Sequence, residues 1–239
     1  MKGLLTGSGM GKLYLVLFGI VILLGASGAG AASYRLTDMG NLGPVKSGYC
    51  MPTSINRQGD VAGWASVNSA SQRHAFLWKN GVMTDLGTLG SHIDSEANRI
   101  NNAGQVLVNA TGSDGKARGF IWQNGVWTDL GLLPGGDACA PLALNNLGQV
   151  VGHASIHVTI GNIQYMGGTA FLWQNGVLQD LNQQIPPDSG IYLNAAGAIN
   201  DLGQITATYN IPDVFSEGRA VLLTPITKAA LGPMMLLLQ

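Results

Sequence analysis

Side chains that are capable of metal binding or acid/base catalysis are scattered through this chain of 239 residues. His92, Asp94 and Glu96 alternate, so an extended strand would aim all three to one side, as a cation site requires. A polar loop cluster explains the same spacing without an ion. His153 and His157 are separated by about 13 Å along a strand, too far to bind one ion together. We therefore expect no metal and no cofactor.

Carboxylates also recur in register along the chain, which raises the question of acid/base catalysis. Four aspartates occupy the same place in successive repeats: Asp38, Asp85, Asp129 and Asp180. One carboxylate per repeat is typical of a turn cap or a backbone hydrogen bond. A catalytic pair would instead break the repeat and place two carboxyl groups about 5 to 10 Å apart in one cleft. We expect a protein that is not an enzyme. The alternative is a secreted polysaccharide hydrolase or lyase that uses the loop carboxylates Asp94, Glu96 and Asp137.

Two repeated units define the elements that position these residues. The first unit is Asn-x-x-Gly, which begins at Asn56, Asn101, Asn145 and Asn200. The second is an aromatic segment that ends in Trp78, Trp122 and Trp173, and Asn-Gly follows each tryptophan after one residue. Asn-Gly between apolar strands predicts a hairpin with a type I′ turn, and Asn-x-x-Gly predicts a second turn. Each repeat therefore predicts four short antiparallel strands, with the tryptophans packed between repeats.

Four-stranded meanders bury both faces when they stack radially as the blades of a β-propeller. The fourth repeat has three strands, and a segment resembling the missing fourth strand occurs at residues 34 to 40. Pairing it with residues 219 to 224 would complete the blade. We therefore predict an all-β, propeller-like repeat domain, with four blades of four antiparallel strands closed by the N-terminal strand. An open β-solenoid and a larger ring completed by a second chain are the alternatives.

The most regular repeat carries a family resemblance. It reads His74-Ala75-Phe76-Leu77-Trp78, followed by Asn80-Gly81-Val82-Met83-Thr84-Asp85-Leu86-Gly87. This segment resembles the HAF repeat of bacterial extracellular proteins, and the resemblance covers residues 34 to 225. Arg118 and Thr169 replace the histidine in the next two copies. The resemblance implies secretion and a β-rich repeat domain, and it implies no catalytic residues.

The connections that differ between repeats are the predicted ligand face. In an up-and-down meander the two tight turns lie at one edge, and the two longer connections lie at the other. Binding residues are often carried by such loops on a rigid scaffold. The candidate ligand-face residues are Tyr49, His92, Asp94, Glu96, Asp137 and Tyr192. We expect a protein or glycan partner there, unless these loops are only solvated connections.

The two cysteines, Cys50 and Cys139, each lie six residues before the asparagine of a repeat, in the first and third repeats. Opposite blades of a four-membered ring would carry them. Since an exported chain with two cysteines can oxidise them, a disulfide between these blades is one prediction. Two independent buried thiols are the other.

Composition and the chain ends indicate export. Residues 1 to 31 have the layout of a secretory signal peptide, with cleavage expected after Ala31 or Ala32. The repeat domain follows at 34 to 225, and an apolar tail covers 226 to 239. A net charge of −1 argues against a nucleic-acid partner. We expect a secreted or extracellular protein, or one of the periplasm or cell envelope, which contacts a membrane only if the signal segment stays uncleaved. It would be a binding scaffold or, alternatively, a purely structural envelope protein.

Overall fold

The computed structural model confirms the all-β prediction. It describes residues 16–17, 20–21, 33–42, 49–68, 72–160, 163–211 and 214–226. This part of the chain holds antiparallel sheets and one short 3-10 helix, Leu181–Gln183. None of the helical structure described is long and apolar enough to cross a membrane. The predicted apolar tail lies outside the described residues from 227 onward, as does most of the predicted signal segment.

The chain divides into two compact units, residues 1 to 40 and residues 41 to 239. The first unit contains a small sheet of three two-residue strands, β1 (Val16–Leu17), β2 (Ile20–Val21) and β3 (Leu36–Thr37). In this sheet β3 pairs with β2. The second unit contains the repeats.

Each repeat forms its own antiparallel sheet, with strands in sequence order, as the meander predicts. The first sheet is β4 (Cys50–Ile55), β5 (Val61–Ser66), β6 (Arg73–Lys79) and β7 (Val82–Gly87). The second is β8 (His92–Ile100), β9 (Val106–Gly112), β10 (Ala117–Gln123) and β11 (Val126–Asp129). The third is β12 (Gly136–Leu144), β13 (Val150–Ile160), β14 (Ile163–Gln174) and β15 (Val177–Asp180). The fourth is β16 (Tyr192–Ile199), β17 (Ile205–Ile211) and β18 (Val214–Leu223).

The hairpin turns follow from local backbone requirements. Asn80, Asn124 and Asn175 are the non-glycine residues with positive φ among those described, and each precedes a glycine that also has positive φ. This pair of left-handed residues is what a type I′ turn needs, and it matches the twist of the flanking strands. The Asn-Gly signal therefore correctly predicted the turn between the third and fourth strands in each of the first three sheets.

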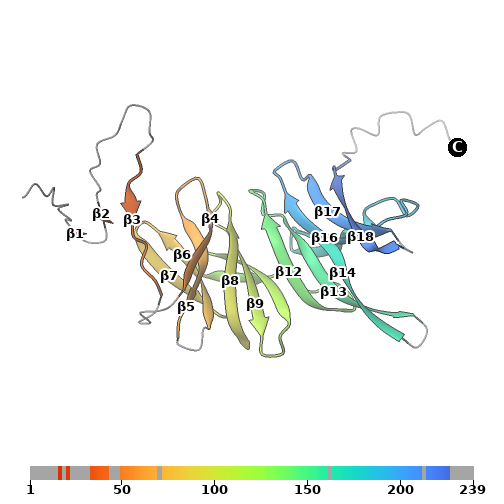
Figure 1. The fold of residues 1–239 in the computed structure, drawn as a ribbon, viewed down its shortest axis with the longest axis horizontal. Coiled ribbons are helices and arrows are strands. Elements are labelled where there is room, and N and C mark those ends of the chain that lie inside the picture. The colour runs from red at the N-terminus through yellow and green to blue at the C-terminus, as the bar shows by residue number, and fades with distance from the viewer. Residues whose placement is uncertain are drawn as a thin grey trace, which may run out of the picture. The chain divides into compact units, whose positions relative to one another are not determined.

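The four sheets follow one another in a row, with the first and fourth sheets at opposite ends (Figure 1). The first strand of each later sheet packs on the middle strands of the preceding one: β8 on β5 and β6, β12 on β9 and β10, and β16 on β13 and β14. Three apolar clusters fill the three junctions. The core therefore lies between sheets, as a stacked repeat array requires.

Two features differ from the sequence prediction. The β13–β14 hairpin is longer than the short strands predicted for each repeat, since its register runs out to Ile160 and Ile163. Among the described residues the fourth sheet has three strands, and the first and last sheets do not form a closed ring. The four-bladed closure therefore stays a prediction.

Candidate functional site

The turn edge of the array is a ladder of hydrogen bonds made by the repeated asparagines. Asn145 Oδ1 accepts from Leu147 N at 3.0 Å and from Gln149 N at 2.9 Å, which closes its own turn. Its Nδ2 donates across the junction to the carbonyl oxygen of Asn200 at 3.0 Å. Asn56 and Asn101 make the corresponding bonds to the next repeat. This edge is occupied by structural bonds within the array.

The repeated aspartates also form turns. Asp85 Oδ1 accepts from Gly87 N at 2.6 Å, and Asp129 Oδ1 accepts from Gly131 N at 2.8 Å. Asp38 and Asp180 accept in the same way from residues 40 and 182. Each carboxylate therefore caps the bend after its strand. The backbone bond expected at these positions is present in all four copies.

The opposite edge holds a hollow of about 470 Å³ between the second and third sheets. The connections before β8, between β9 and β10, and before β12 build it, so residues distant in sequence meet there. The residues lining it are Ser91, His92, Gly112, Ser113, Asp114, Lys116, Arg118, Asp129, Leu132, Gly136 and Asp137. Two of the predicted ligand-face residues, His92 and Asp137, therefore belong to one concave surface.

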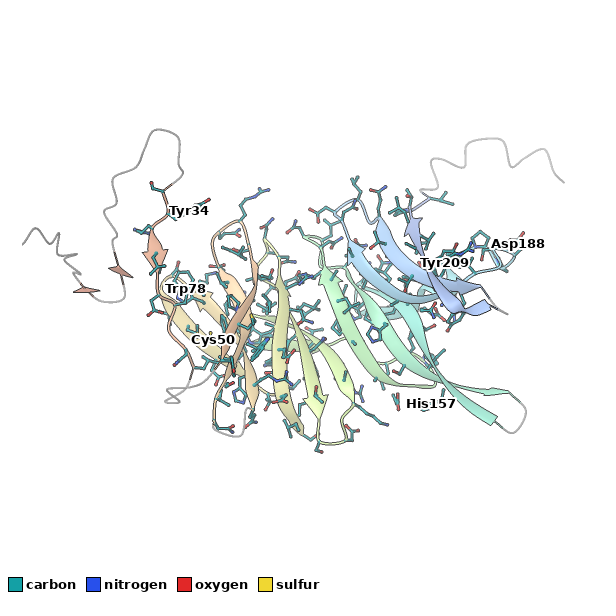
Figure 2. The ribbon with its side chains drawn as sticks, in the orientation of Figure 1. Tyr34, Cys50, Trp78, His157, Asp188 and Tyr209 are labelled. Atoms are coloured by element: carbon teal, nitrogen blue, oxygen red, sulfur yellow. The ribbon has the colours of Figure 1, made fainter. Side chains whose placement is uncertain are left out.

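Asp137 is the most strongly engaged carboxylate of this hollow. Its Oδ2 lies 3.0 Å from His157 Nε2 and 3.1 Å from Lys116 Nζ. His157 is carried by β13 (Figure 2). Hydrogen bonds from His157 and Lys116 lower the pKa of Asp137 below its usual range. Asp137 is therefore held as a carboxylate at neutral pH and has no proton to give.

Arg118 is the residue of this hollow that sequence reasoning passed over. It occupies the repeat position of His74, whose Nδ1 lies 3.0 Å from both carboxylate oxygens of Asp85. No hydrogen bond or ion pair within the described part of the chain engages the half-buried Arg118. The sequence signal for Arg118 was its departure from the repeat, because an arginine occupies the position at which the most regular copy has His74. Its guanidinium group is a charged donor of the hollow without a hydrogen-bond partner among the described residues.

The predicted pair Asp94 and Glu96 lies elsewhere and has a structural role. Arg73 of the first sheet forms ion pairs with both carboxylates, and its backbone N donates to Asp94 Oδ1 at 2.8 Å. The guanidinium carbon of Arg73 also lies 5.6 Å from the ring centre of Trp64. A register shift between His92 and Asp94 separates the histidine from the two acids. These carboxylates join the first two sheets.

The remaining candidates, His92, Tyr192 and Tyr49, have separate surroundings. His92 packs edge-on against Phe120, with ring centres 5.4 Å apart. The Tyr192 hydroxyl hydrogen bonds to Thr169 Oγ1, and burial raises the pKa of that phenol. Tyr49 is exposed, outside the lining of the hollow. Within the described residues no three histidine, cysteine or acidic side chains form a metal-binding group.

Two of the three repeat tryptophans and one of the two cysteines pack at the junctions between sheets. Trp122 packs at the junction of the first and second sheets, and Trp173 packs at the junction of the second and third. Trp78 is half-buried on the first sheet (Figure 2). Cys50 and Cys139 are free thiols, so the structure does not contain the disulfide considered from the sequence. Cys139 is enclosed in the second junction, where burial raises its pKa to about 12.

The fold and the hollow together describe an all-β repeat array with a mixed-charge concave surface on its loop edge. Comparison with known proteins found no matching family model and no matching curated protein. The resemblance to the HAF repeat therefore remains a prediction from the sequence.

Proposed function

We propose that this chain is an exported, non-enzymatic binding scaffold that holds a protein or glycan partner at its loop edge. The observation that carries the proposal is the hollow between the second and third sheets, built from the connections that differ between repeats. Loops on a rigid scaffold are where binding residues concentrate. The turn edge, by contrast, is occupied by its own asparagine ladder.

The groups around the hollow suit a polar partner. Arg118 offers guanidinium donors, and Asp114 offers carboxylate oxygens, so hydroxyl groups of a glycan or polar side chains of a protein can bind both. Lys116 and Asp137 already pair with each other. They form one wall of the hollow and leave Arg118 as the main anchor.

The carboxylates support binding over catalysis. A general acid needs a raised pKa, whereas the pKa of Asp137 is lowered by its two cationic neighbours. Asp94 and Glu96 are both paired with Arg73. The acids considered for a hydrolase or lyase are therefore engaged in ion pairs of the scaffold.

We propose that this scaffold is a propeller-like array. The supporting observation is that the first strand of each later sheet stacks on the preceding sheet. The fourth sheet needs a fourth strand, and the segment from 34 to 40 has the sequence to supply one. A four-bladed ring closed by the chain's own strand is one form of this completion, and an assembly of several chains is the other.

The test is a glycan-array screen combined with thermal shift, because a ligand that binds the native state raises its melting temperature. Arg118→Ala should abolish the shift given by any glycan that stabilises the unaltered protein. Arg99→Ala is the matched control, since Arg99 is an exposed arginine of β8 outside the hollow. Equal loss of binding in both variants would refute this assignment of the site.

A further inference from the structure

The third and fourth sheets share a groove that extends to β18, the last strand of the fourth sheet. The groove has a volume of about 550 Å³ and a lining that includes Leu172, Leu181, Ile185, Ile205 and Leu223. At the two earlier junctions a fourth strand contributes an apolar side chain to the core: Trp127 from β11 and Leu178 from β15. The fourth sheet has no such strand among the described residues. The groove is where its apolar side chain would lie.

The chain contains a segment with the required features. Leu36 stands two residues before Asp38, as Trp127 stands before Asp129 and Leu178 before Asp180. Asp38 Oδ1 accepts from Gly40 N at 2.9 Å, and Gly40 has a φ of 77°. Asp129 and Gly131 make the same turn, with a distance of 2.8 Å and a φ of 82°. Leu36 and Thr37 therefore form a short strand, followed by the same turn that follows a fourth strand in the array.

The spacing to the first sheet agrees with this role. Asp38 precedes Asn56 by 18 residues, and the corresponding separations in the later repeats are 16, 16 and 20. The segment is thus the last strand of a blade that would precede the first sheet. Among the described residues the fourth sheet has three strands, and the segment that resembles a fourth strand pairs with β2, outside the four repeat sheets.

The turn edges of the first and last sheets are complementary. Asn200 is exposed; its Nδ2 donates to Gln204 Oε1 at 2.8 Å and, among the described residues, makes no bond across a junction of the kind that Asn145 makes. Asn56 has the carbonyl oxygen that such a bond would need. At the adjacent position Asn102 and Asn146 are neutral within the array, whereas the terminal repeats carry Arg57 and Asp201. Asp201 accepts hydrogen bonds from Asn146 N and Nδ2, both at 2.8 Å, and it stays exposed, as Arg57 does, so the two ends of the array carry opposite charges.

We infer that the open edge of β18 and its groove bind the strand Tyr34 to Asp38 of a second copy of this chain, with Leu36 in the groove. A second copy is the occupant because the first and fourth sheets of one copy lie at opposite ends of the row (Figure 1). Strand addition to an exposed sheet edge supplies backbone hydrogen bonds, and the side-chain pocket supplies the register. Such head-to-tail contacts close into a ring or extend, as the rotation between copies dictates.

This assembly belongs to the exported form of the chain. Leu36 and Thr37 pair with Ile20 and Val21, which lie in the predicted signal segment. Cleavage after Ala31 or Ala32 removes that partner. Leu36 is 57% exposed and Leu222 of β18 is 58% exposed, so both strands present apolar surface for pairing.

The first experiment measures the mass of the exported protein, produced from the full-length chain, by light scattering over a range of concentrations. We expect a multiple of the monomer mass, and we expect Leu36→Asp to give monomers with an unchanged melting transition at the lowest concentration. Leu147→Asp is the control, because Leu147 is an exposed leucine at a turn outside the groove. A monomeric unaltered protein, or an assembly that Leu36→Asp leaves intact, would overturn the inference.

The second experiment identifies the contact itself. By the register of β14 and β15, Thr37 should oppose Leu222, as Gln179 opposes Leu172. One tagged copy carries Thr37→Cys and a differently tagged copy carries Leu222→Cys, both with Cys50→Ser. Oxidation should join the two tags in one product, and neither substitution should cross-link alone.

A chain that carries both cysteines and closes on itself at monomer mass would show a four-bladed ring and overturn the inference. No cross-link in either arrangement would overturn it as well. Neither outcome affects ligand binding at Arg118, which the thermal-shift experiment measures separately.

Discussion

The two edges of the same sheets are built on different principles. At the turn edge the repeated asparagines bind their own turn and the next repeat, so each residue has a structural partner. At the loop edge the same repeat position holds His74, Arg118 or Thr169, and the contacts differ in every copy. The repeat is therefore uniform where sheets are joined, and it varies where a partner can approach. A substitution should cost stability at the first edge and binding at the second.

Among these variants, Asn145→Ala should cause the largest loss of stability. The substitution removes both bonds that close the turn and the bond to Asn200 across the junction. Because the asparagine is buried, the freed backbone groups lose partners without gaining full hydration. We expect the free energy of unfolding to fall by about 2 to 4 kcal/mol. Chemical denaturation measures this, and a loss below about 1 kcal/mol would contradict a ladder that joins the sheets.

Asn200→Ala should cause a smaller loss of stability than Asn145→Ala at the same edge. Asn200 closes its turn through the same two backbone bonds, but it is exposed and makes no onward bond in the described chain. We expect a loss of about 1 kcal/mol, typical of a capping side chain, at concentrations where the protein is monomeric. Denaturation curves of the two alanine variants give the contribution of the cross-junction bond by difference. Equal losses would show that this bond contributes nothing.

Arg118→Ala examines the loop edge for stability. The side chain has no hydrogen bond or ion pair with the described residues, so its loss should change the free energy of unfolding by less than about 0.5 kcal/mol. Arg73→Ala is the matched comparison, since it frees Asp94 and Glu96 and removes the contact with Trp64. It should cost more than Arg118→Ala in the same denaturation experiment. A reversed order would mean that Arg118 supports the fold.

The turns and sheets were predictable from sequence because their causes are local. Asn80 followed by Gly81 specifies positive φ at both residues, and the asparagine of Asn-x-x-Gly caps its own turn. The pairing of Asp94 and Glu96 with Arg73 was not predictable, because it depends on how two sheets stack and on a register shift in β8. The length of the β13–β14 hairpin was not predicted, although the dipeptide Gly161-Asn162 between the two strands is a hairpin signal in the sequence. Ring closure depends on contacts between the two ends of the array, and local sequence does not specify them.

The loop edge also gives the smallest expected effect, a pH dependence carried by Asp137. Its pKa in the folded protein is lowered first by the hydrogen bond from His157 and then by that from Lys116. In the unfolded chain the pKa returns to about 3.9. The stabilisation is therefore fully present above about pH 4 and is lost as the pH falls through the pKa of Asp137 in the folded protein.

The difference in unfolding free energy between the unaltered protein and Asp137→Asn should shrink over that acidic range and stay constant above it. Removing the imidazole, as in His157→Asn, should weaken this change without eliminating it, because Lys116 remains 3.1 Å away. Denaturation of the three proteins between pH 2 and 7 measures it. A difference that grows toward acid would mean that Asp137 is destabilising when ionised, and the loop edge would then contain strained charge in place of a paired wall for the hollow.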